Sequence, residues 1–246
     1  MALTSWMQAP LRALAAHVVR QRLTAVERRL PPLPCGRELV LESDDDVVRR
    51  GAPGLAVWPA APALCRHLLE RRQELGGGRV LELGAGTGAV GLFAAGLGAR
   101  PTLTDYRPRG PARDEVLAQL RRNVDANSEM CGPVDVLELE WGNLEQGRAA
   151  ASNGPYCMLF GSDVTYRPAS HEALLQTAAW LCDAGHPRPP LLLAHHSWGT
   201  ISPATRWLGL RDSKLTHLQK VAKNGGWDIE EVGYDRSIVI LELTRR

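Results

Sequence analysis

A glycine-rich turn offers the clearest chemistry in this sequence of 246 residues. Residues 79–91 read Arg-Val-Leu-Glu-Leu-Gly-Ala-Gly-Thr-Gly-Ala-Val-Gly, with an apolar run before the glycines and small residues after them. Glycine permits positive φ and places no Cβ in the way of a ligand. A helix that begins at such a turn adds free N–H groups and the positive end of its dipole. We therefore predict a binding site for a small polar or anionic ligand.

Two cofactor classes fit this turn. Gly84-x-Gly86-x-x-Ala89 satisfies the dinucleotide fingerprint. The run from Glu82 to Gly88, Glu-x-Gly-x-Gly-x-Gly, resembles instead the first motif of S-adenosylmethionine-dependent methyltransferases. A carboxylate at position 82 is unwelcome beside a pyrophosphate, but it can help to hold the polar amino-acid end of S-adenosylmethionine. Glu82 therefore favours the second class.

A second acidic residue, Asp105, follows 21 residues after Gly84 and ends a predicted strand over 101–104. A carboxylate in this place faces the ribose of a bound nucleoside, because its two oxygens suit the two ribose hydroxyls. The alternative is an aspartate that caps a helix. Because both cofactor classes carry a ribose, Asp105 does not decide between them.

The elements that must position these residues alternate along the chain. Strands are expected at 80–83, 101–104, 134–139, 156–160 and 190–194, with helices between most of them. Such alternation predicts an α/β fold with a parallel sheet. Two closing strands at 227–232 and 237–243 follow each other closely, so we expect an antiparallel pair at the sheet edge. A short hairpin is expected at 37–42 and 47–48.

In an open α/β sheet, ligands bind beyond the carboxyl ends of the strands. Trp141 follows the third strand, where it is placed to lie against a planar ring; the alternative is a tryptophan that covers the core. Asp163 and Tyr166 follow the fourth strand and face the middle of the predicted cleft, although Asp163 could cap the next helix. His195 and His196 lack a third ligand at suitable spacing, so we interpret them as polar residues at a strand end.

Composition limits the classes of function. The formal net charge of +2 shows no general basic field for nucleic acid. The five cysteines are scattered and form no Cys-x-x-Cys pair, so neither a zinc site nor a disulfide framework is expected. No apolar run is long enough to span a membrane.

We predict an N-terminal helix and proline-rich link over 1–36, and one domain over 37–246. Residues 1–30 are rich in arginine, so an organelle transit peptide is the alternative to a packed helix.

Taken together, the motifs resemble methyltransferase family 16, the seven-strand protein lysine methyltransferases. In chain order they are Leu55-Ala-Val-Trp58-Pro59-Ala60-Ala61, Leu81-Glu82-Leu83-Gly84-Ala85-Gly86-Thr87-Gly88, Asp105, Asn123-Val124-x-x-Asn127, Trp141-Gly142 and Gly161-Ser162-Asp163-Val164-Thr165-Tyr166. The resemblance implies a Rossmann-like seven-strand sheet with helices on both faces, S-adenosylmethionine as the cofactor, and no catalytic metal. The residues it implies for the cofactor are Trp58, Glu82, Gly84, Ala85, Gly86, Asp105, Trp141 and Ser162.

The same resemblance places Asp163 and Tyr166 beside the amine that receives the methyl group. Two departures leave the substrate open: this family commonly has alanine at the position of Ser162 and an aliphatic residue at that of Thr165. The resemblance implies a protein substrate among chaperones, ATPases or translation factors. We expect a cytoplasmic monomer, with nuclear location and organelle targeting left open. The alternatives are an N-terminal amine or small-molecule acceptor, a NAD-dependent oxidoreductase, and a cofactor-binding partner without activity.

Overall fold

The structure is a computed structural model that describes residues 29–44, 52–107, 114–197, 212–235 and 237–246. The predicted N-terminal helix and the predicted strand at 47–48 lie outside these residues. The division of the chain at residue 36 therefore stays a prediction. Within the described ranges, no helix is long and apolar enough to cross a membrane.

A single sheet of seven strands forms the middle of the molecule, in the order β3-β2-β1-β4-β5-β7-β6. The strands are β1 (Arg79–Leu83), β2 (Arg100–Asp105), β3 (Asp135–Glu138), β4 (Met158–Ser162), β5 (Leu191–His196), β6 (Trp227–Asp235) and β7 (Ile238–Arg245). Strands β1 to β5 are parallel, whereas β7 runs antiparallel to both β5 and β6. The Rossmann-like α/β fold with an antiparallel C-terminal edge is therefore confirmed. The strand order reverses between β1 and β4, where such sheets bind ligands.

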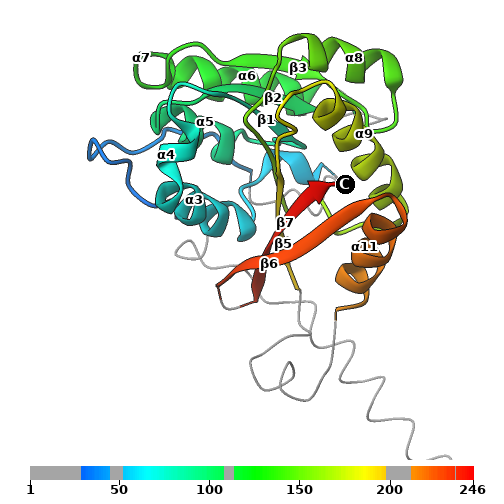
Figure 1. Ribbon diagram of the computed structural model, residues 1–246. Helices are drawn as coiled ribbons and strands as arrows, with labels where there is room; N and C mark the ends of the chain where they lie inside the picture. Colours follow the sequence, from blue (N-terminus) through cyan, green and yellow to red (C-terminus); the bar gives the residue numbers. More distant parts are fainter. Residues whose placement is uncertain (1–28, 45–51, 108–113, 198–211, 236) are drawn as a thin grey trace, which may run out of the picture.

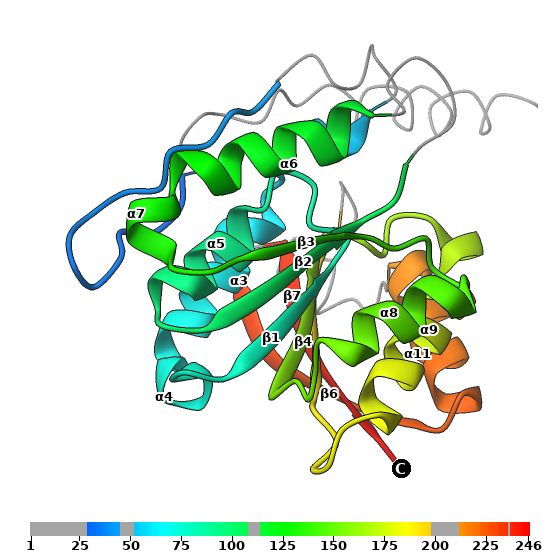
Figure 2. The same ribbon diagram turned by 90° about the horizontal axis from the view of Figure 1, so that it is seen from above.

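Helices cover both faces of this sheet (Figures 1 and 2). On one face lie α3 (Ala60–Glu70), α5 (Ala89–Gly96) and α6 (Glu115–Ala126), with the short α4 (Arg72–Leu75) and α7 (Ser128–Cys131) beside them. The other face carries α8 (Leu144–Ser152), α9 (His171–Asp183) and α11 (Ser213–Asn224). Two short 3-10 helices, η3 (Pro53–Leu55) and η4 (Pro168–Ser170), lie in the connections.

The central strands are apolar because both of their faces are covered. In β1, four of the five residues are buried, and Leu81 and Leu83 pack toward α9 while Val80 packs toward α3 and α5. Continuous burial of this kind is typical of a parallel strand between two helical layers. The result is a rigid strand whose carboxyl end delivers the glycine turn to a fixed place.

The predicted strand over 37–42 is wrong. Its backbone instead pairs with the side-chain amides of Asn123 in α6 and of Asn127, the residue that follows this helix. The Val40 N–H donates to Asn127 Oδ1 (3.0 Å), Asn127 Nδ2 donates back to the Val40 carbonyl (2.7 Å), and the Glu42 N–H donates to Asn123 Oδ1 (2.7 Å). Two asparagines four residues apart thus take the place of a neighbouring strand as hydrogen-bond partners. Such a pairing cannot be predicted from the hydrophobic pattern of the sequence.

Helix α8 was not expected from the sequence. It begins after Asn143, whose Oδ1 accepts a hydrogen bond from the Gln146 N–H at 3.2 Å. An asparagine followed three residues later by glutamine is a signal for a helix start. The signal was present, but the short run of alanines after it lacks a strong apolar face.

Candidate active site

A cavity of about 310 Å³ opens at the carboxyl ends of β1, β2, β3 and β4. All ten of the predicted site residues line it, and these are Trp58, Glu82, Gly84, Ala85, Gly86, Asp105, Trp141, Ser162, Asp163 and Tyr166. They come from five separate stretches of the chain, and the parallel strands bring them to one edge. Their individual roles stay predictions, since a shared cavity alone does not assign them.

The glycine turn is packed on both sides by backbone and side chains. Gly84, Gly86 and Gly88 have φ values of 66°, 55° and 80°, which glycine adopts without strain. A Cβ on Gly86 would lie 2.9 Å from the carbonyl oxygen of Gly54. Gly54 therefore presses directly on the turn, and η3 forms part of the wall around the cavity. Gly54 belongs to no motif in the sequence that would mark it as part of the site.

Asp105, the last residue of β2, holds the end of this strand against the glycine turn. Its Oδ2 accepts a hydrogen bond from the Gly86 N–H (2.7 Å) and its Oδ1 from the Tyr106 N–H (2.8 Å). Burial raises the pKa of Asp105 to about 6, although both hydrogen bonds act in the opposite direction. A carboxylate oxygen accepts more than one hydrogen bond, so hydroxyl donors such as those of a ribose still find acceptors here.

Glu82 is nearly enclosed, with 2% of its surface exposed. Its Oε2 accepts a hydrogen bond from the Gly91 N–H of α5 at 2.8 Å. Burial raises its pKa to about 8; the Gly91 bond opposes this shift, and the Asp105 carboxylate adds to it. The cavity lining also includes Asp163, Glu140 and a single cation, Arg167. Carboxyl groups thus outnumber cations in this lining, which suits a positively charged ligand.

Asp163 occupies an unusual backbone position at the end of β4. Its φ of 54° is the one positive value among the described residues that are not glycine. Its Oδ2 accepts a hydrogen bond from the Ala60 N–H at the start of α3, and its Oδ1 from the His196 N–H, both at 3.2 Å. Asp163 therefore caps α3 rather than the helix that follows it. Such strain often marks a functional position.

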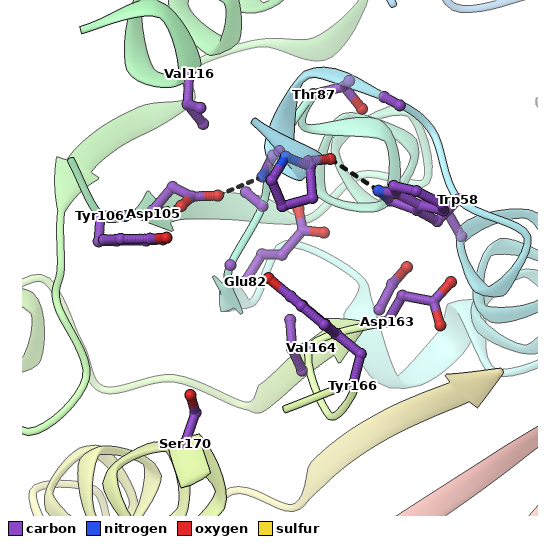
Figure 3. A pocket seen from close by; sticks show the side chains of 18 of the residues that line it. Trp58, Glu82, Thr87, Asp105, Tyr106, Val116, Asp163, Val164, Tyr166 and Ser170 are labelled. Atoms are coloured by element: carbon purple, nitrogen blue, oxygen red, sulfur yellow. Dashed lines mark hydrogen bonds between the residues drawn. The ribbon is translucent and has the colours of Figure 1, made fainter. Parts of the chain in front are cut away.

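Burial raises the pKa of Asp163 to about 6, while the N–H groups of Ala60 and His196 and the positive charge of Lys214 lower it. Figure 3 shows Asp163 next to Trp58 at one end of the cavity and Asp105 with Tyr106 at the other. Trp58 is fixed by a hydrogen bond from its Nε1 to the Pro53 carbonyl at 2.8 Å. The carboxylate thus lies in a mostly enclosed corner with an aromatic wall.

Two tyrosines stand at the cavity mouth. Tyr166 is 37% exposed and Tyr106 38% exposed. The guanidinium of Arg167 lies over the Tyr166 ring, 5.3 Å from its centroid. Tyr106 and Arg167 were not predicted as site residues. Tyr106 directly follows Asp105, so the rule that ligands bind beyond the strand ends could have found it.

Among the residues that the structure describes, no group of three or more histidine, cysteine, aspartate or glutamate side chains could hold a metal ion. His195 is completely buried, contrary to a simple polar strand end, and it is bonded to Thr165 and Asp212. The cavity therefore offers carboxylates, aromatic walls and backbone N–H groups as its chemistry.

The sequence model of a family described as lysine methyltransferase matches residues 38–197. The chain belongs to this lysine methyltransferase family. The matched range includes all ten predicted site residues, and it confirms the resemblance to methyltransferase family 16.

Similar proteins carry related names. The protein N-lysine methyltransferase METTL21A of Danio rerio is 42% identical over 122 residues, which is 49% of this chain and 52% of that protein. The EEF1A lysine methyltransferase 3 of Xenopus tropicalis is 36% identical over 126 residues, 51% of each. The histone-arginine methyltransferase METTL23 of Mus musculus is 33% identical over 153 residues, 62% of this chain and 57% of that protein. This chain thus spans about half the length of the relatives that it matches.

Solved structures share the fold. The glycopeptide N-methyltransferase MtfA has a TM-score of 0.53 at 14% identity, over 76% of this chain and 90% of that one. A ribosomal protein L11 methylase from Lactobacillus delbrueckii subsp. bulgaricus has a TM-score of 0.51 at 16% identity, over 77% and 80%. At such identities the likeness concerns the fold alone.

Proposed function

We propose that this protein transfers methyl groups from S-adenosylmethionine to a lysine side chain of a protein substrate. One observation carries the proposal: the glycine turn with Asp105 and the Asp163–Tyr166 turn line the same cavity. One part suits a nucleoside cofactor and the other suits an amine. Membership of the lysine methyltransferase family supports the same reaction.

The residues present fit S-adenosylmethionine. Its ribose hydroxyls would meet the Asp105 carboxylate, and its amino-acid end would lie near Glu82 and the N–H groups of the glycine turn. The excess of carboxyl groups in the lining suits the cofactor's ammonium and sulfonium charges. The sulfonium would supply an electrophilic methyl group.

Asp163 would receive the substrate amine. Lysine must be neutral to attack, and its ordinary pKa is ~10.4. A partly dry cleft and a nearby positive charge lower that pKa. The Asp163 carboxylate would then accept a hydrogen bond from the amine and direct the nitrogen lone pair, while the Tyr166 ring would flank the lysine stem. Most of the rate would come from this positioning.

The proposed substrate is a protein, with translation factors, chaperones and ATPases as the candidate classes. The relative named EEF1A lysine methyltransferase 3 supports the first of these. An arginine acceptor is the second candidate, because a relative at 33% identity is named a histone-arginine methyltransferase. We also propose that the protein acts in the cytoplasm as a monomer.

The proposal is tested with a cell extract that lacks this protein. The purified protein and S-adenosylmethionine labelled in its methyl group are added, and proteins that gain label are identified by mass spectrometry. We expect one or a few labelled proteins with the wild type and none with Asp163→Ala, although this variant still binds S-adenosylhomocysteine. Labelling at the wild-type rate by Asp163→Ala would contradict the role given to Asp163.

Calorimetry separates the main rival. A NAD-dependent oxidoreductase would use the same glycine turn, so S-adenosylhomocysteine and NAD are titrated in parallel. We expect binding of S-adenosylhomocysteine only, because the cavity lining holds four carboxyl residues and one cation, Arg167, which disfavours the pyrophosphate of NAD. Tight binding of NAD would overturn the choice of cofactor.

A further inference from the structure

A chain of buried polar groups lies directly behind the Asp163–Tyr166 turn, outside the cavity. Thr165 Oγ1 lies 2.6 Å from His195 Nδ1, and His195 Nε2 lies 3.2 Å from Asp212 Oδ2. Thr165 and His195 have no exposed surface, and Asp212 is 5% exposed. Buried groups of this kind must be fully paired, because an unmet hydrogen bond is expensive inside a protein.

The direction of each hydrogen bond follows from Asp212. The pKa of Asp212 lies below its ordinary value: burial raises this pKa, but the hydrogen bond from His195 and those from the N–H groups of Lys214 and Leu215 lower it by more. An ionised carboxylate only accepts, so His195 carries a proton on Nε2. In the neutral imidazole, Nδ1 then accepts from the Thr165 hydroxyl. Asp212 thereby fixes the tautomer of His195.

A second histidine holds the backbone of the same turn. His171 Nε2 lies 2.9 Å from the Thr165 carbonyl oxygen, which can only accept. His171 Nδ1 lies 3.0 Å from His217 Nδ1. Burial lowers the pKa of His171, which favours the neutral form that this arrangement needs. Thr165 is therefore held through its side chain from β5 and through its carbonyl from α9.

Strand β5 also holds Asp163 itself. The Asp163 N–H donates to the Ala194 carbonyl at 2.9 Å, and the His196 N–H donates to Asp163 Oδ1 at 3.2 Å. His195 stands between these two residues and bonds to Thr165. In β5, Ala194 and His196 thus bond to Asp163, and His195 between them bonds to Thr165 and Asp212.

We propose that Asp212 and His195 are positioning residues, which act through Thr165 to hold the turn that presents Asp163 and Tyr166 to the substrate amine. The order threonine, histidine, aspartate is that of a hydrolytic triad. The hydroxyl of Thr165 is completely buried, however, so no substrate reaches it. The inference rests on the proposed function for the identity of the reaction.

Asp212→Asn is the sharpest test, because the N-terminal cap of α11 fixes how an asparagine must lie. Asp212 Oδ1 accepts hydrogen bonds from the N–H groups of Lys214 (2.7 Å) and Leu215 (3.4 Å). An asparagine would keep its oxygen there, and it caps helices as well as aspartate does. Its NH2 group would then face His195 Nε2. His195 would have to move its proton to Nδ1 and donate to Thr165 instead of accepting.

Three measurements are made on wild type and Asp212→Asn. Nitrogen-15 NMR of the histidines should show a proton on Nε2 of His195 in the wild type and on Nδ1 in the variant. Amide hydrogen exchange over 163–166 should become faster while the rest of the domain is unchanged. The kcat for methyl transfer should fall by about tenfold to a hundredfold. The KM for S-adenosylmethionine and the Tm should stay near their wild-type values.

Substitutions at Thr165 provide the rescue and the control. Thr165→Val removes the hydroxyl and should resemble Asp212→Asn in kcat and amide exchange, whereas Thr165→Ser keeps the hydroxyl and should restore both. Thr102→Val is the matched control, since Thr102 is a buried threonine of β2 that is not among the residues lining the cavity. It should leave both values unchanged.

Two results would overturn the inference. One is a wild-type kcat and wild-type exchange over 163–166 in Asp212→Asn and Thr165→Val. The other is a loss of kcat that is matched by a general fall in Tm and is not restored by Thr165→Ser, because the role would then be merely structural. If the wild type transfers no methyl group, the proposed function fails, and the tautomer and exchange measurements still decide about the positioning.

Discussion

At the scale of single residues, three carboxyl groups dominate the candidate site, of which Glu82 and Asp105 are buried and Asp163 is half-buried. Glu82, Asp105 and Asp163 all line the cavity, and burial raises the pKa of each. The hydrogen bonds that Glu82 and Asp105 accept come from neutral backbone donors, which are the N–H groups of Gly91, Gly86 and Tyr106. A cationic ligand would supply the missing charge, and this argues for a sulfonium cofactor and an amine substrate over a dinucleotide.

The charge of Asp163 predicts a pH dependence of the reaction. Its pKa of about 6 means that the carboxylate is protonated below this value and no longer accepts a hydrogen bond from the amine. The amine of the substrate lysine is protonated at every pH below its own pKa, so it must also lose a proton before it can attack. We therefore expect log(kcat/KM) to rise with pH. Above about pH 6 its slope should correspond to the loss of one proton, from the lysine, and below about pH 6 the slope should be steeper because Asp163 must also lose a proton. A single slope from pH 5 to pH 8 would contradict this role of Asp163.

At the scale of elements, two segments remote from the sheet stabilise the glycine turn. The extended residues 40–42 bond to the amides of Asn123 and Asn127, and Asn123 Nδ2 continues from there to the Thr87 carbonyl at 2.8 Å. Helix η3 presses on Gly86 through Gly54. The turn thus depends on the segment before α3 as well as on β1.

Asn127→Ala tests the first of these contacts. Asn127 is 2% exposed and bonds to the Val40 N–H, the Val40 carbonyl and the Asn123 carbonyl. Its removal takes away partners of part-buried backbone groups, so we expect a loss of about 1 kcal/mol in the free energy of unfolding. Urea denaturation measures the loss. Arg121→Ala, at an exposed position of α6, serves as control and should stay within about 0.5 kcal/mol of wild type.

Gly86→Ala and Gly98→Ala form a matched pair for the second contact. Both glycines have positive φ, 55° and 96°, so both substitutions strain the backbone by roughly 1–2 kcal/mol. Only at Gly86 would the Cβ also meet the Gly54 carbonyl, at 2.9 Å, whereas a Cβ on Gly98 has nothing within 4 Å. Calorimetry with S-adenosylhomocysteine should show lost affinity for Gly86→Ala alone. Equal affinity in the two variants would mean that the close approach of Gly54 does not shape the cofactor site.

At the scale of the whole molecule, most of the fold could be predicted from local patterns. Apolar runs and glycine turns located the seven strands, and the rule for parallel sheets brought Asp105, Trp141 and Asp163 to one edge. What could not be predicted were contacts between distant polar residues. His195 meets Thr165 and Asp212 across 30 and 17 residues of sequence, and the two asparagines at the carboxyl end of α6 meet a segment 81 to 87 residues away. No periodicity marks such pairs, because single hydrogen bonds leave no repeating pattern.

The buried carboxyl group of Glu82 also predicts how the free energy of unfolding varies with pH. Its folded pKa of about 8 lies above the ordinary value of 4.5, so the folded state holds the proton more tightly than the unfolded chain. The protonated Glu82 therefore contributes to the free energy of unfolding. This contribution is fully present below the ordinary pKa of 4.5 and is lost as pH rises through about 8. Asp105 and Asp163 have pKa values of about 6, so their contributions to the free energy of unfolding are lost mostly below pH 6.5. His67 and His171, whose pKa values are lowered by burial, also titrate below 6.5.

Between pH 6.5 and 8, we therefore expect the free energy of unfolding of the ligand-free protein to fall with rising pH. Glu82→Gln keeps the shape of the side chain and removes the titration, so its stability should be nearly constant over this range. Urea denaturation at several pH values compares the two proteins. A wild-type stability that rises from pH 6.5 to 8 would show that Glu82 is ionised in the folded state.

The most direct test of the central claim is the chemical position of the transferred methyl group. A labelled substrate protein is digested after reaction with the wild-type enzyme, and tandem mass spectrometry of the peptides locates the label. The Asp163–Tyr166 end of the cavity predicts methyl groups on the side-chain nitrogen of lysine, and none when Asp163→Ala is used. A methyl group on arginine, on an N-terminal amine or on a small molecule would contradict the account.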